Sequence, residues 1–106
     1  MENRKVTVLD LNGCKSLDEL HERLSITFDF PDWYGRNWDA FWDLLNMEVP
    51  EELTNVEITG LTKLPADLKD CGEMMIKIMQ ENKEDHEESG RTIPNYDYRF
   101  DYKIID

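Results

Sequence analysis

The chain has 106 residues, a length that supports one hydrophobic core and predicts a single domain over residues 1–106. Twelve Lys and Arg stand against 24 Asp and Glu, so the formal net charge is -12. Nucleic-acid binding is driven mainly by Lys and Arg that neutralise phosphates, so this charge argues against direct contact with nucleic acid and favours a basic partner. Solubility alone is the simpler explanation of an acidic composition.

Targeting signals and cofactor motifs are absent from the sequence. The N-terminal residues lack the apolar run of a signal peptide, and no segment approaches the length of a membrane helix. We therefore expect a cytoplasmic protein that does not bind membranes. Cys14 and Cys71 belong to no CxxC pattern, and His21 and His86 are the only histidines, so we expect free thiols, no metal site and no cofactor.

The first elements are a strand and a helix. Val6 and Val8 stand at period-two spacing among β-branched neighbours in residues 5–11, which predicts a strand. Ser16 is followed three residues later by a glutamate, the spacing of a capping box, in which both side chains satisfy free amides at a helix start. Leucines at helical spacing then predict a helix over residues 17–25.

A loop and a second helix follow. Pro31 and Gly35 mark a loop over residues 29–35. Asn37 is a suitable N-cap for a helix that ends near Asn46.

The remaining elements are less regular. Val56 and Ile58 predict a second strand, and Pro65 suits the first turn of a short third helix. Gly72 precedes a fourth helix over about residues 73–85, on which Met74, Met75 and Met79 serve as core filler.

The C-terminal part is predicted as a loop followed by a strand. Residues 84–99 are polar and contain a glycine and a proline, so we expect an exposed loop there, and residues 99–106 alternate as a last strand. Strands separated by helices imply right-handed crossovers. The predicted fold class is α/β, with a small parallel sheet packed against about four helices.

All three tryptophans lie within residues 30–45, interleaved with aspartates. Helical spacing over this segment places four apolar residues on one stripe that packs against the sheet: Trp38, Phe41, Trp42 and Leu45. Asp39 and Asp43 lie one turn apart beside that stripe, where like charges repel by about 0.2 to 0.5 kcal/mol. They are either a solvated face or, in the company of Trp33 and Tyr34, part of a protein-binding surface.

A further acidic face on the fourth helix raises the question of catalysis. Its members are spaced four apart: Glu73, Lys77, Glu81 and Asp85. Asp39, Asp43 and Glu81 could in principle hold magnesium or hydrolyse a glycoside. Two carboxylates on adjacent helix turns form a patch rather than the opposed walls of a cleft, and the sequence has no phosphate loop, GxSxG or HExxH pattern. We therefore predict a protein that is not an enzyme.

The segment PDWYGRNWDAFWDLL, residues 31–45, resembles the motif of the barstar family of intracellular ribonuclease inhibitors. The matching positions run without a gap: Pro31, Asp32, Trp33, Tyr34, Gly35, Asn37, Asp39, Ala40, Trp42 and Asp43. The order of elements agrees over about residues 5–85. The resemblance implies a barstar-like fold, a three-stranded parallel sheet packed with helices.

The resemblance also implies a function, that of an immunity protein in a toxin–antitoxin pair. Its partner would be a basic secreted ribonuclease or a related toxin domain, whose phosphate-binding active site is blocked by an acidic helix and loop. Asp43 would be the main anchor and Asp39 its support, with Trp33 in the place of a tyrosine that stacks over the active site. The other implied partner-binding residues are Gly35, Asn37, Trp42 and Glu81.

Three departures from the family pattern point to a partner other than barnase. Arg36 puts a positive charge into the contact loop, residues 46–48 lack an aromatic, and residues 86–99 read as an inserted loop. They leave two alternatives: a barstar-fold interaction module without a nuclease target, and, less favoured, a metal-dependent hydrolase built on the acidic trio.

Overall fold

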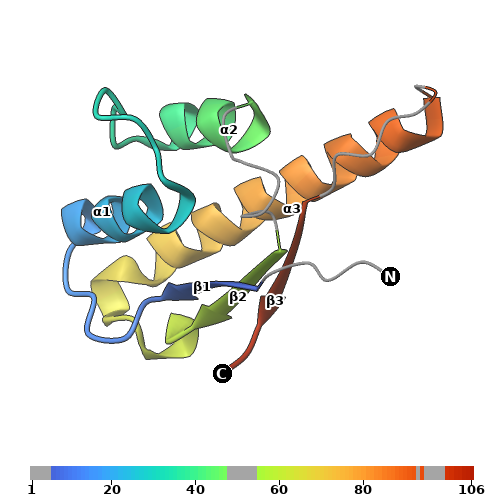
Figure 1. Cartoon of the computed structure of the whole chain (residues 1–106). Coiled ribbons are helices and arrows are strands. Elements are labelled where there is room, and N and C mark those ends of the chain that lie inside the picture. Colours follow the sequence, from blue (N-terminus) through green and yellow to red (C-terminus); the bar gives the residue numbers. More distant parts are fainter. Residues whose placement is uncertain (1–5, 48–54, 93, 95–99) are drawn as a thin grey trace.

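The computed structural model describes residues 6–47, 55–92, 94 and 100–106. Three parallel strands form one sheet in the order β1-β2-β3: β1 (Thr7–Asp10), β2 (Asn55–Thr59) and β3 (Asp101–Ile104). The described helices are α1 (Leu17–Phe28), α2 (Trp38–Met47) and α3 (Lys69–Thr92), with 3-10 turns η2 (Leu61–Lys63) and η3 (Ala66–Leu68). The α-helices lie on one side of the sheet (Figure 1). The predicted α/β class and the three-stranded parallel sheet are confirmed.

Residue alternation gives the sheet its covered and uncovered faces. In β2, Val56 and Ile58 are fully buried, while the alternating positions Asn55, Glu57 and Thr59 are only partly covered. Leu9 of β1 is paired in register with Ile58 and is also fully buried, whereas Val8 is 54% exposed. Successive side chains of a strand point to opposite faces, so one face carries the core and the other meets solvent.

A glycine sets the close packing at the end of β2. The amide of Leu11 donates to the carbonyl of Thr59 at 2.8 Å, which brings the turn after β1 against Gly60. Gly60 has φ +81°, and a Cβ at this position would lie 2.5 Å from the amide nitrogen of Asn12. Both facts require glycine here.

The capping of α1 agrees with the sequence, and its end lies further along the chain than predicted. The Oγ of Ser16 accepts a hydrogen bond from the amide of Glu19 at 3.1 Å. The helix continues to Phe28, which extends the buried face by one turn, instead of ending near residue 25. It stops where Asp29 adopts a left-handed conformation, φ 55°.

The predicted short third helix is the 3-10 turn η3, and the predicted fourth helix, α3, follows it directly. Pro65 precedes only the 3-10 turn η3, and α3 begins directly after it at Lys69. The predicted start after Gly72 was wrong, because this glycine lies inside α3. A Cβ on it would lie 2.8 Å from Cδ1 of Leu64 and 3.2 Å from Cδ1 of Leu61, so the glycine permits close packing of η2 on the helix.

The predicted loop over residues 86–99 was wrong for residues 86–92, which are helical. Polarity suggested a loop, but α3 keeps a buried face as it leaves the core, through Asn82 and His86. The amide Nε2 of Gln80 donates to Oε2 of Glu84 at 3.0 Å on the outer side. Residues 95–99 lie outside the described part of the chain.

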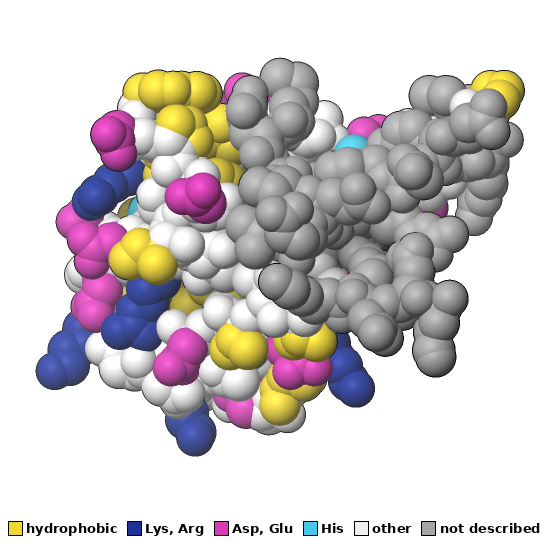
Figure 2. Space-filling view, in the orientation of Figure 1, with side chains coloured by type: hydrophobic (Ala, Val, Ile, Leu, Met, Phe, Trp, Pro, Cys, Tyr) yellow, Lys and Arg dark blue, Asp and Glu magenta, His cyan; other side chains and the backbone are white. Residues whose placement is uncertain are grey.

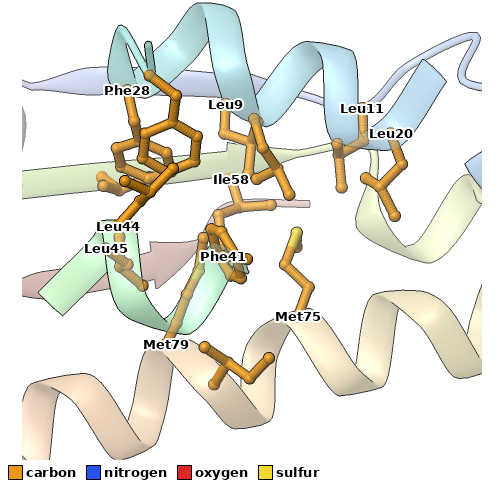
Figure 3. Packing of buried hydrophobic residues seen from close by; sticks show 14 of the residues in the cluster. Leu9, Leu11, Leu20, Phe28, Phe41, Leu44, Leu45, Ile58, Met75 and Met79 are labelled. Carbon is orange, nitrogen blue, oxygen red and sulfur yellow. The ribbon is translucent and has the colours of Figure 1, made fainter. Parts of the chain in front are cut away.

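The core lies between the sheet and the helices. In Figure 3, side chains from β1, β2, α1, α2 and α3 converge on one cluster. Its fully buried members include Leu9, Leu20, Phe28, Phe41, Leu45, Ile58, Met75 and Met79. Met74 is 41% exposed, so of the three methionines predicted as core filler it alone lies largely outside. In the described part of the chain, no helix combines the length and the apolar character that crossing a membrane requires.

Candidate partner-binding surface

The predicted contact residues of the loop and α2 are concentrated on one end of the molecule. Trp33 is 70% exposed, and Asp39 and Asp43 on α2 are exposed. Figure 2 shows hydrophobic side chains gathered at the top of the molecule, over α2 and the loop before it, with acidic side chains beside them. Because exposed aromatic side chains are enriched in protein interfaces, this end of the molecule is a candidate binding surface.

The aromatic stripe of α2 explains why its carboxylates point outward. Phe41 and Leu45 are fully buried in the core, and Trp38 and Trp42 are partly buried against it. Burial of this stripe fixes the rotation of the helix, which leaves the opposite side to solvent. The carboxylates therefore stand on a helix whose orientation the core determines.

The loop before α2 is fastened to α1 through Tyr34. Its hydroxyl lies 2.7 Å from Nδ1 of His21, and both side chains are buried. The His21 ring also packs against the indole of Trp38, with 4.6 Å between the ring centroids. Burial lowers the pKa of His21 and raises the pKa of the Tyr34 phenol, so both are neutral near pH 7.

Gly35 and Asn37 shape the junction between loop and helix. Both are exposed, and the Asn37 side chain caps α2 by accepting a hydrogen bond from the amide of Ala40 at 2.8 Å. The same side chain donates to the carbonyl of Gly35 at 3.3 Å. A Cβ on Gly35 would lie 3.1 Å from Nδ2 of Asn37, so a larger residue would disturb the cap.

Arg36 occupies the centre of this junction and is bound to α1. Its backbone is left-handed, φ 53°. Its Nη1 donates to Oδ1 of Asp18 at 2.8 Å, and both side chains are well exposed. The hydrogen bond to Asp18, together with the charges of Asp18 and Glu22, raises the pKa of Arg36. Its guanidinium is therefore paired with a carboxylate of the same molecule.

Glu81 is the one predicted contact residue from another element. It is exposed on α3, while the other six lie within residues 33–43. Its neighbour Asn82 is fully buried and donates through Nδ2 to Oδ1 of Asn46 on α2, at 3.3 Å. Glu81 is therefore one residue away from a contact between α3 and the last turns of α2.

Sequence analysis missed the residues of α1 that support the loop. His21 falls on the leucine stripe of α1, between Leu20 and Leu24, and this position could have marked it as a buried partner of the loop. Asp18 gave no such signal, because its partner Arg36 is 18 residues away in the sequence.

Two other kinds of site were considered, a metal site and a groove. Among the described residues, no group of three or more His, Cys, Asp or Glu side chains is placed to hold a metal ion. An open groove of about 560 Å³ lies between η2, α3 and β3, with Leu61, Leu64, Lys69, Glu73, Ile76 and Ile104 in its lining. None of the predicted contact residues lines it.

Comparison with known proteins agrees with this fold and surface. The profile of the family described as "Barstar (barnase inhibitor)" matches residues 4–95. The chain therefore belongs to this family of ribonuclease inhibitors, whose members are not enzymes. The match confirms the resemblance found in the sequence. A protein of Bacillus subtilis (strain 168), named "Putative ribonuclease inhibitor YrdF", is 43% identical over 53 residues. The match covers 50% of this chain and 57% of that protein.

Proposed function

We propose that this chain inhibits a basic, barnase-type ribonuclease in the cytoplasm by covering its active site with α2 and the loop before it. The observation that carries the proposal is the pair Asp39 and Asp43, exposed on a helix whose other side is locked into the core. A ribonuclease active site binds phosphates with cationic side chains. Carboxylates on a fixed helix can accept the same hydrogen bonds, and charge-assisted bonds of this kind are the strong ones.

The contact residues have distinct roles in this proposal. Asp43 is the main anchor among the arginines and lysines of the partner, and Asp39 supports it. Trp33, which is 70% exposed, covers the rim of the active site with its indole. Asn37 and Gly35 hold the loop in shape, while Trp42 and Glu81 extend the contact along α2 and α3.

The overall charge of the chain should also increase the rate at which it associates with the enzyme. A net charge of -12 steers the chain toward a basic enzyme and raises the association rate, an effect that salt screens. The barnase and barstar pair is itself an established example of such steering. Removing one member of a buried charge pair in an interface costs about 2 to 5 kcal/mol, because the other member stays desolvated and unpaired.

The test is a titration of the chain into a panel of barnase-type ribonucleases, with RNA cleavage followed at low and high salt. We expect inhibition at one inhibitor per enzyme, weakened by salt. Asp43→Ala should lose most of this inhibition. Glu73→Ala, which removes the same charge from the groove on α3, is the matched control and should inhibit nearly as well as the unmodified chain. Equal inhibition by the two variants would contradict the proposal.

A further inference from the structure

Arg36 is an unfavourable residue for the proposed function, which makes its surroundings informative. It lies between Gly35 and Asn37, just before α2. In the proposed complex, the basic active site of the partner would face this part of the chain. A free guanidinium there would repel the partner's cations.

The structure ties this guanidinium to α1. Nη1 of Arg36 lies 2.8 Å from Oδ1 of Asp18. Asp18 and Glu22 are four residues apart on α1, and like charges at this spacing repel. The positive charge of Arg36 offsets the repulsion between Asp18 and Glu22, so the pairing stabilises α1 as well as the loop.

The backbone of the loop supports the same arrangement. A residue other than glycine with φ 53° is uncommon, and such a conformation persists where the surrounding structure determines it. Here three attachments surround it: the pair with Asp18, the contact between Tyr34 and His21, and the cap that Asn37 places on α2. Asp18 and His21 are three residues apart on α1, so the loop is held at two points of one helix.

We infer that Asp18 is a positioning residue for the inhibitory loop, one that holds Arg36 against α1 and keeps its charge away from the partner. This inference rests on the proposed function and extends it to α1, outside the contact surface itself.

The test uses variants matched in charge, followed by association kinetics with the inhibited ribonuclease at low salt. Asp18→Ala and Glu73→Ala each remove one negative charge, and the double variant Asp18→Ala/Arg36→Ala keeps the net charge of the unmodified chain. We expect Asp18→Ala to associate about fivefold more slowly than Glu73→Ala, because Arg36 is released. The double variant, which has no guanidinium to release, should associate faster than Asp18→Ala. Equal rates for Asp18→Ala and Glu73→Ala, or an equal loss in Arg36→Ala alone, would overturn the inference.

A second measurement needs no ribonuclease. Trypsin cleaves after arginine, and cleavage of the Arg36–Asn37 bond is followed by mass spectrometry in the free proteins. We expect Asp18→Ala to be cut at this bond several times faster than Glu73→Ala, because the loop has lost its anchor. Equal cleavage means that Asp18 does not position the loop, whether or not any ribonuclease is inhibited. Loss of inhibition in Asp43→Ala together with no effect of Asp18→Ala in either assay would leave the proposed function standing alone.

Discussion

At the scale of single residues, Asp39 and Asp43 are placed where they do little for the stability of the free protein. Both are exposed, one helix turn apart, and their mutual repulsion costs about 0.2 to 0.5 kcal/mol. Asp39 lies in the first turn, where the helix dipole favours a negative charge, but Asp43 lies beyond that turn. Binding and stability should therefore respond differently to the loss of Asp43.

We predict that Asp43→Asn leaves the free energy of unfolding unchanged or raises it by up to about 0.5 kcal/mol. The same substitution should weaken binding to the inhibited ribonuclease by about 2 kcal/mol or more. Urea unfolding and calorimetric titration measure the two quantities. A loss of stability that matches the loss of binding would instead mean that Asp43 serves the fold.

His21 gives stability a dependence on pH. Burial lowers its pKa in the folded state, so the unfolded chain takes up a proton first as the pH falls. His86 is also buried, and desolvation lowers its pKa in the same way. Stability from both groups is complete above the unfolded pKa of about 6.5 and is lost as the pH falls below it toward the folded values.

We therefore predict a lower free energy of unfolding at pH 5.5 than at pH 7.5, measured by urea unfolding. His21→Gln removes one of the two titrating groups, so its difference between the two pH values should be smaller than in the unmodified chain. A decline of the same size in His21→Gln would show that His21 does not contribute.

At the scale of elements, Asn37 at the start of α2 both caps the helix and lies in the proposed contact surface. The Oδ1 of Asn37 accepts from the amide of Ala40, which satisfies a backbone donor that would otherwise be unpaired. We predict that Asn37→Ala costs about 1 kcal/mol of unfolding free energy, whereas Asn37→Ser, which can still cap, costs much less. Thermal unfolding of the two variants measures this difference, and equal losses would mean that capping is not the cause.

Substitutions at two glycines with similar backbone conformations distinguish the cost of backbone strain from the cost of a steric clash. Gly13 and Gly60 have φ of +78° and +81°, but a Cβ at Gly13 has its nearest neighbour 3.9 Å away, while one at Gly60 would meet the Asn12 amide nitrogen at 2.5 Å. We predict that Gly13→Ala costs about 1 to 2 kcal/mol, the cost of the left-handed conformation alone. Gly60→Ala should cost clearly more in the same urea unfolding experiment, and equal costs would contradict the packing of this turn against β2.

The same scale shows what the sequence could and could not predict. The strands, the cap of α1 and the outward-facing carboxylates of α2 follow from local periodicity and capping, which act within a few residues. Gly72 was misread because Leu61 and Leu64, which leave no room for a side chain there, precede it by two or more helix turns in the sequence and meet it only through the tertiary fold. The helical residues 86–92 were misread because their composition is polar and carries no apolar stripe, although His86 is buried. The pairing of Asp18 with Arg36 is a tertiary contact, and no local rule predicts it.

At the scale of the whole molecule, the proposed acidic contact surface is the solvent side of elements whose other side packs into the core. The sheet and all three α-helices contribute to the core, and the solvent side of α2 lies with its preceding loop at one end of the molecule (Figure 1). The net charge of -12 and this placement together favour fast, salt-sensitive capture of a basic partner. The contact surface can accordingly be changed at its exposed carboxylates with little effect on the core.

Occlusion of the active site is the central claim, and competition tests it most directly. The affinity of the chain for the inhibited ribonuclease should be measured by calorimetry at rising concentrations of a mononucleotide that occupies the enzyme's phosphate site. If α2 and its loop fill that site, the apparent Kd rises in proportion to the nucleotide concentration. An apparent Kd that stays constant when the site is saturated with nucleotide would show that the chain binds elsewhere on the enzyme.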